Sequence, residues 1–181
     1  VFVYRTGTVD CGGRLCVAAP HARSYSALVA IAAPAPTPLL LGNGAIARGL
    51  IEAGCEVVTA YPGTPATEIL EETIRQKTEL GLDITTEWSV NEKIAFGVAL
   101  AASLCGKRAA VAMKQVGLNS ASDSLLSAAY TGVVGGFVLI SCDDPGPHSS
   151  QTEQDSRLFA HFAKIPVLDP SSPREARDMV L

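Results

Sequence analysis

The chain has 181 residues, of which 48% are hydrophobic and 18% are charged, and its formal net charge is -4. A chain of this length can bury the core of one ordinary domain, and this composition excludes a disordered protein. The charge is too small and too mixed to favour nucleic acid or an anionic membrane surface as a partner. No apolar run reaches the roughly 18 residues that span a bilayer, so no membrane partner is expected either.

Five cysteines are present, Cys11, Cys16, Cys55, Cys105 and Cys142. Their number is odd and no C-x-x-C pair occurs, so neither a disulfide framework nor a local zinc or iron–sulfur site is predicted. The last three lie in apolar periodic segments, where buried free thiols are expected. This cysteine usage predicts a reducing, cytoplasmic setting.

Both ends of the sequence indicate a piece of a longer polypeptide. The chain begins with valine rather than methionine, and it stops at Leu181 inside an apparent helix. Ser172 is the expected N-cap of that helix, and Glu175 holds the capping-box position. Residues 1–37 lack periodicity and end in an Ala- and Pro-rich, linker-like stretch. We therefore expect an irregular N-terminal extension, followed by one domain at 38–181 that is truncated at its C-terminus.

Strand-like and helix-like segments alternate through the regular region. The expected elements are an apolar run at 39–41, a helix at 43–53, a strand at 56–61, a helix at 65–80, a strand at 83–88, a helix at 90–104, a strand at 108–114, a helix at 120–130, a strand at 136–142, a polar loop through 156, a helix to 164, a strand at 166–168 and a helix from 173. This alternation predicts an α/β fold, doubly wound, with a mostly parallel sheet and helices on both faces.

Unusual polar groups follow four of the expected strands. They lie at 61–65, 89–92, 114–119 and 143–151. Ligands of such sheets bind beyond the carboxyl ends of the strands. The functional site is therefore expected where these four segments meet.

Glu92 has two interpretations from its neighbours. Ser89-x-x-Glu92 matches a capping box, in which the glutamate only accepts a backbone N–H. However, the following segment at 94–102 is apolar on nearly every face, so we expect that helix to be buried all round. A carboxylate in its first turn then lies at the edge of a dry region and is a functional candidate.

The run at 91–95, followed by 99–106, resembles the glutamate segment of thiamine-diphosphate enzymes. The resemblance implies that Glu92 hydrogen-bonds the N1′ atom of the aminopyrimidine and favours the imino tautomer that deprotonates thiazolium C2. The cofactor then acts as the electron sink for decarboxylation of a 2-oxo acid. The resemblance also implies that Asn91, Gly63 and Thr64 contact the cofactor.

Three further blocks, at 61–68, 113–119 and 143–157, are similar in order to the N-terminal domain of the large subunit of indolepyruvate:ferredoxin oxidoreductases. This resemblance covers about 39–181 and implies the pyrimidine-binding domain of the thiamine-diphosphate-binding fold. The implied reaction is oxidative decarboxylation of aryl 2-oxo acids such as indolepyruvate, with coenzyme A as acyl acceptor and ferredoxin as electron acceptor. Gly44, Gln115 and Thr152 depart from the family pattern, where Glu, His and Asn are expected.

The chain has neither a diphosphate–Mg²⁺ motif nor a cysteine cluster for 4Fe-4S centres. Thiamine diphosphate with Mg²⁺ is therefore expected to be completed by a diphosphate-binding domain or partner subunit outside this chain, and the iron–sulfur clusters are expected in the missing part.

Three more residues are candidate substrate ligands. By the resemblance, Thr64 binds the substrate carboxylate, although it also suits an N-cap before Pro65. Lys114 neutralises a carboxylate, or is a solvated lysine at a strand end. Asn119 contacts substrate, or Asn119 or Ser120 caps the next helix.

Other patterns carry less chemistry. Asp143, Asp144 and His148 enclose turn-forming residues, so loop structure is favoured and no metal site is predicted. The roles of the run at 149–151 and of Arg157 stay open between an interface and a substrate loop. The glycines from position 42 do not have dinucleotide-binding spacing.

Two other functions remain open. One is a different thiamine-dependent 2-oxo acid oxidoreductase, acting on pyruvate or branched-chain substrates. The other is a non-catalytic α/β assembly domain in which Glu92 is only a cap.

Overall fold

The computed structural model describes residues 2–4 and 40–181, with the exception of residues 147 and 149. The expected linker, the proposed domain boundary at residue 37, and Cys11 and Cys16 lie outside the described residues. Within them, no helix is both long enough and apolar enough to cross a membrane.

The sheet has five strands in the order β1 (Phe2–Tyr4), β5 (Phe137–Cys142), β4 (Ala109–Lys114), β2 (Val57–Ala60) and β3 (Thr85–Trp88). Strands β2 to β5 run parallel, and β4 is buried along its whole length because helices cover both of its faces. The sequence did not predict β1, which pairs antiparallel with β5. The expected α/β class with a mostly parallel sheet is confirmed.

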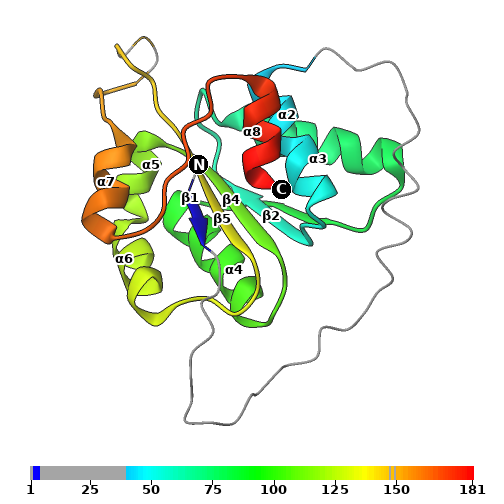
Figure 1. Cartoon of the computed structure of the whole chain (residues 1–181), viewed down its shortest axis with the longest axis horizontal. Coiled ribbons are helices and arrows are strands. Elements are labelled where there is room, and N and C mark those ends of the chain that lie inside the picture. The colour runs from blue at the N-terminus through cyan, green and yellow to red at the C-terminus, as the bar shows by residue number, and fades with distance from the viewer. Residues whose placement is uncertain (1, 5–39, 147, 149) are drawn as a thin grey trace. The chain divides into compact units, whose positions relative to one another are not determined.

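Seven helices occur among the described residues: α2 (Gly42–Glu52), α3 (Thr67–Leu80), α4 (Glu92–Leu104), α5 (Gln115–Ser120), α6 (Ser122–Thr131), α7 (Ser156–Ala163) and α8 (Pro173–Val180). Helices α2, α3 and α8 pack on one face of the sheet, and α4 to α7 pack on the other (Figure 1). The prediction of helices on both faces is therefore confirmed.

The helix expected at 120–130 is confirmed as α6, and α5 precedes it within the polar segment at 114–119, where the sequence predicted no helix. Two other local predictions are wrong. The strand expected at 166–168 is only a bridge at Val167. Cys105 is exposed rather than buried, because it follows the last residue of α4 at the protein surface.

Helix α4 is fixed to the sheet by one polar and one aromatic contact. The buried Thr59 hydroxyl of β2 donates a 2.7 Å hydrogen bond to the backbone oxygen of Ala95. The rings of Phe96 and Phe137 pack edge to face with centroids 5.2 Å apart. These contacts set the position of the first turn of α4.

The last helix returns to pack along α2. Its expected N-cap is confirmed, since the Ser172 hydroxyl accepts a hydrogen bond from the Glu175 amide. The Glu175 carboxylate accepts from Ser171 rather than from Ser172. Arg177 of α8 pairs with Glu52 at the end of α2 and closes this face of the domain.

Candidate functional site at the carboxyl ends of the parallel strands

The four polar segments meet at the carboxyl ends of β2 to β5, as predicted from the alternation of elements. The contacts pair segments that lie far apart in sequence. A Cβ atom on Gly63, after β2, would lie 3.4 Å from Cβ of Lys114 at the end of β4. Gly117 of α5 lies against the side chain of Glu92 of α4, and a Cβ atom on Gly117 would overlap that side chain.

Glu92 is the first residue of α4 and is half-buried. The capping box expected at Ser89 is wrong, because Asn91 is the N-cap and its Oδ1 accepts from the Ile94 amide at 2.9 Å. Ser89 instead donates to Glu87. The Glu92 carboxylate has no hydrogen bond or ion pair within the described part of the chain, so it is available to a group from outside.

Helix α5 forms one wall beside Glu92. A Cβ atom on Gly117 would lie 2.7 Å from Oε1 and 2.9 Å from Cδ of Glu92, and closer still to its Cγ. Gly117 belongs to the polar segment at 114–119 and had no predicted role of its own. A glycine in a helix directly after a buried strand was the available signal.

The turn after β2 contains a cis peptide bond between Thr64 and Pro65. The Thr64 side chain is exposed, and α3 begins only at Thr67, so the prediction of Thr64 as an N-cap is wrong. The Thr67 hydroxyl accepts a 2.9 Å hydrogen bond from the Gly63 amide and takes the local role instead. The Thr64 side chain is therefore exposed to solvent at this turn and does not cap α3.

Lys114 is only 7% exposed, so the alternative of a solvated lysine is wrong. Its aliphatic stem lies beside Gly63, where a Cβ atom would make ordinary van der Waals contact with it. Asn119 is exposed in the last turn of α5. It is not the cap of the next helix, because Ala121 holds that position without a side-chain hydrogen bond.

Gln115 is a buried polar residue that sequence analysis recorded only as a departure from the family pattern. Its amide nitrogen donates to the backbone oxygen of Thr152 at 3.1 Å, and Gln154 donates to its backbone oxygen. Its Oε1 is buried and has no hydrogen-bond partner among the residues that the structure describes. Gln115 thus ties the start of α5 to the loop that follows β5.

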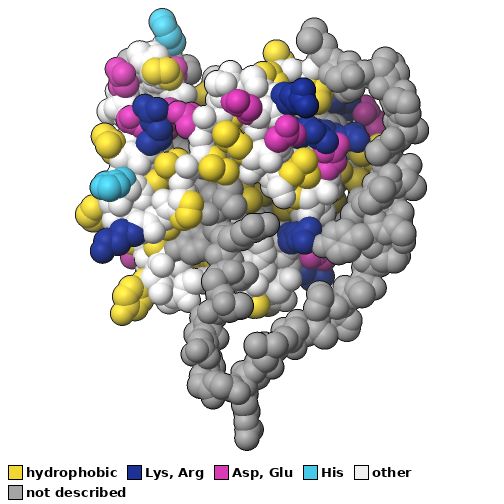
Figure 2. All heavy atoms as spheres, in the orientation of Figure 1, with side chains coloured by type: hydrophobic (Ala, Val, Ile, Leu, Met, Phe, Trp, Pro, Cys, Tyr) yellow, Lys and Arg dark blue, Asp and Glu magenta, His cyan; other side chains and the backbone are white. Residues whose placement is uncertain are grey.

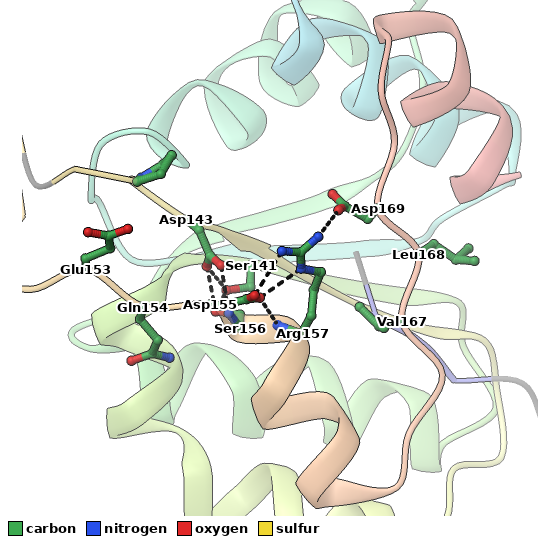
Figure 3. Close-up of a pocket in the computed structure, with 11 residues that line it drawn as sticks. Ser141, Asp143, Glu153, Gln154, Asp155, Ser156, Arg157, Val167, Leu168 and Asp169 are labelled. Carbon is green, nitrogen blue, oxygen red and sulfur yellow. Dashed lines mark hydrogen bonds and ion pairs between the residues drawn. The ribbon is translucent and has the colours of Figure 1, made fainter.

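The loop after β5 lines a cavity of about 440 Å³ (Figure 3). On one wall, the Asp143 carboxylate accepts hydrogen bonds from the Ser156 amide and hydroxyl. On another, Arg157 lies between Asp155 and Asp169, at 2.9 Å from each. The hydrogen bond from Arg157 lowers the pKa of Asp155. Most of these polar groups thus form hydrogen bonds or ion pairs with one another.

No group of three or more His, Cys, Asp or Glu side chains suited to a metal ion occurs among residues 2–4 and 40–181 outside the two undescribed positions. Asp144, for which the sequence favoured a role in loop structure, accepts a hydrogen bond from Ser150, and His148 is exposed. Position 44 lacks a side chain, and the Glu72 carboxylate lies 3.5 Å from the point where a Cβ atom would stand.

The prediction that α4 is buried all round is wrong for this chain. Its outer face is apolar but exposed, with Ile94 at 46% and Leu104 at 50%, and Val90 just before the helix at 79%. Tyr130, in the neighbouring α6, is 94% exposed. The apolar pattern of α4 therefore does not report burial within this domain.

Hydrophobic side chains reach the surface over α6 and α7, where they lie among charged side chains (Figure 2). The exposed apolar residues of these two helices are Leu126, Tyr130, Leu158 and Phe162. Exposed apolar area is thus concentrated on the face that carries Glu92.

A mostly parallel sheet with helices on both faces and polar segments at the carboxyl ends of its strands defines the class of open α/β domains, which bind ligands at that edge. Residues 48–181 match the family described as pyruvate flavodoxin/ferredoxin oxidoreductase, thiamine-diphosphate-binding. The match covers more than half of the chain, and the chain belongs to this family.

The chain is also similar to individual proteins. It is 56% identical over 142 residues to the indolepyruvate oxidoreductase subunit IorA of Archaeoglobus fulgidus, which covers 77% of this chain and 23% of that protein. It is 30% identical over 149 residues to the 2-oxoglutarate synthase subunit KorA of Methanothermobacter thermautotrophicus, which covers 77% of this chain and 38% of that protein. The chain thus spans less than half the length of either relative.

A solved structure shares the fold. It is the 2-oxoglutarate:ferredoxin oxidoreductase from Magnetococcus marinus with 2-oxoglutarate, coenzyme A and succinyl-CoA bound. The TM-score is 0.56 at 28% sequence identity, over 67% of this chain and 21% of that one.

Proposed function

We propose that this chain is the pyrimidine-binding domain of a thiamine-diphosphate-dependent 2-oxo acid:ferredoxin oxidoreductase that converts indolepyruvate and other aryl pyruvates to acyl-coenzyme A. The observation that carries the proposal is the Glu92 carboxylate, which is half-buried, without a partner in the described chain, and placed at the carboxyl ends of the strands. The identity of 56% to an indolepyruvate oxidoreductase subunit, against 30% to a 2-oxoglutarate synthase subunit, supports the aryl substrate.

The residues fit a bound aminopyrimidine. Glu92 offers an oxygen to a ring nitrogen, Gly117 leaves space beside that carboxylate, and Asn91 holds the turn that carries it. When bound, thiamine diphosphate supplies the electron sink for decarboxylation of the 2-oxo acid. Glu92 holds the proton that is shared with the N1′ position, and partial burial strengthens this hydrogen bond.

Other residues of the site take binding roles in this proposal. Gly63 and the Nδ2 group of Asn91, whose Oδ1 is occupied by the cap, contact the cofactor. Thr64 donates to the substrate carboxylate from the exposed turn. Lys114 is buried beside that turn and attracts the same carboxylate as a point charge. Asn119 lines the outer rim.

A second domain or subunit completes the site. The apolar outer face of α4 follows Glu92 directly, and large exposed apolar patches mark interaction surfaces. We propose that a diphosphate-binding domain, which holds Mg²⁺, covers this face and encloses the cofactor. In the complete enzyme, 4Fe-4S clusters held outside this chain would supply electron transfer to ferredoxin. The described cysteines are free thiols, which supports a cytoplasmic setting.

The test is the exchange of the C2 proton of bound thiamine diphosphate in the complete enzyme, followed by deuterium incorporation. Glu92→Gln keeps the shape of the side chain but cannot hold the shared proton as a carboxylate does. Exchange is expected to slow by about 100-fold or more, in the range of general acid–base contributions. The matched control is Glu71→Gln, an exposed glutamate of α3.

Two results would exclude the proposed roles. Exchange that is equally fast in Glu92→Gln and Glu71→Gln would leave Glu92 without a catalytic role and favour the assembly domain. A substrate panel in which pyruvate, branched-chain 2-oxo acids or 2-oxoglutarate outcompete indolepyruvate would reject the aryl preference.

A further inference from the structure

Gly117 lies inside α5, where glycine weakens a helix relative to alanine. Its backbone does not require glycine, because the glycines with positive φ are Gly54, Gly81, Gly106, Gly132 and Gly146 within the described residues. Since conformation does not explain this glycine, the space around it is the remaining physical reason.

That space is filled by Glu92. A Cβ atom on Gly117 would stand within van der Waals overlap of Cγ, Cδ and Oε1 of Glu92, at 2.9 Å from Cδ and 2.7 Å from Oε1. The overlap involves the middle of the glutamate side chain and not only its tip. A rotation of the carboxyl group alone therefore cannot relieve it.

Helices α4 and α5 cannot easily move away from each other. Helix α5 is held by fully buried Leu118 and by the hydrogen bond from Gln115 to the Thr152 backbone. Helix α4 is held by the Asn91 cap and by the buried Thr59 hydroxyl. The Glu92 side chain has no such bonds in the described chain, so it is the part that would be displaced by an added methyl group.

We propose that Gly117 is a positioning residue for Glu92: its missing side chain leaves the space that holds the glutamate in the rotamer that points its carboxylate at the aminopyrimidine. This inference rests on the proposed function for its catalytic consequence. The steric contact between Gly117 and Glu92 does not depend on the proposed function.

The first experiment measures C2 proton exchange of bound thiamine diphosphate in the complete enzyme carrying Gly117→Ala. A displacement of about 1 Å can reduce rates by about 100-fold, and a loss of that order is expected. The matched control is Gly42→Ala, because a Cβ atom on Gly42 meets nothing within 4 Å. Exchange in Gly42→Ala should stay within about twofold of the unmodified enzyme, as for substitutions away from such contacts.

The second experiment measures amide hydrogen exchange of α5 by mass spectrometry in a double-mutant cycle. Gly117→Ala should accelerate exchange of the α5 amides when Glu92 is present, because opening of α5 relieves the strain of the displaced glutamate, and overpacking strain of about 1–3 kcal/mol exceeds the gain in helix propensity. In a Glu92→Ala background the clashing atoms are gone, so Gly117→Ala should slow exchange, because alanine favours the helix. This reversal of sign does not depend on activity.

The outcomes separate the two proposals. Slow C2 exchange in Gly117→Ala together with the sign reversal supports positioning. If Glu92→Gln is slow but Gly117→Ala matches the Gly42→Ala control, positioning is rejected and the proposed function stands. If Glu92→Gln is fast, the proposed function fails, and the cycle alone decides whether the steric contact exists. If Gly117→Ala does not fold, the double variant with Glu92→Ala should restore folding, and its failure to do so rejects the inference.

Discussion

Replacement of Asn91 tests how the first turn of α4 is held. The Asn91 Oδ1 accepts a 2.9 Å hydrogen bond from the Ile94 amide, one of the amides that lack a partner within the helix. Loss of such a cap costs about 1 kcal/mol, with a range of about 0.5–2. An opening equilibrium shifted by 1 kcal/mol changes about fivefold. Asn91→Ala should therefore accelerate hydrogen exchange of the Ile94 and Ala95 amides by about fivefold.

The assay is hydrogen exchange of the complete enzyme, read on peptides that span the start of α4. Asn91→Asp keeps the acceptor oxygen and adds a negative charge that suits a helix N-terminus, so exchange should not accelerate. Ser172→Ala is the matched control, since it removes the corresponding cap from α8. It should accelerate exchange only at Glu175 and its neighbours.

Equal acceleration in Asn91→Ala and Asn91→Asp would refute the capping argument, as would no acceleration in either. The same pair tests the proposed cofactor contact. Asn91→Asp keeps the cap but loses the Nδ2 donors, so weaker binding of thiamine diphosphate with a stable helix would indicate that these donors reach the cofactor.

Two other predictions concern buried groups. Lys114→Met should raise KM for the 2-oxo acid by about 10- to 100-fold in steady-state assays, since hydrogen bonds to charged groups contribute about 1.5–3 kcal/mol; an unchanged KM would reject its role in binding the carboxylate. Burial raises the pKa of the Cys55 thiol from 9.0 to about 12. The unfolded chain therefore ionises first as the pH rises above about 9, and about 1.4 kcal/mol of unfolding free energy should be lost between pH 7 and pH 10. Denaturant titrations at both pH values should show this loss reduced in Cys55→Ala, and an identical loss in that variant would contradict it.

The sequence alone determined the fold class and the edge of the sheet at which the unusual polar segments lie. Alternating apolar strands and periodic helices admit few architectures other than a parallel sheet covered on both faces. In that architecture the segments after successive strands must meet at one edge. For this reason the segments that contain Gly63, Glu92 and Lys114 could be assigned to one edge of the sheet from the sequence pattern alone.

Only the tertiary structure decided which atoms touch. Ser89 and Asn91 both suit an N-cap, and the choice depends on where the chain leaves β3. Gly117 lies 25 positions from Glu92, and no local pattern encodes their contact. The apolar sequence pattern of α4 is the same whether its outer face is covered by its own chain or by another chain. Local pattern fixes which residues avoid water, whereas packing between distant segments fixes what each of them meets.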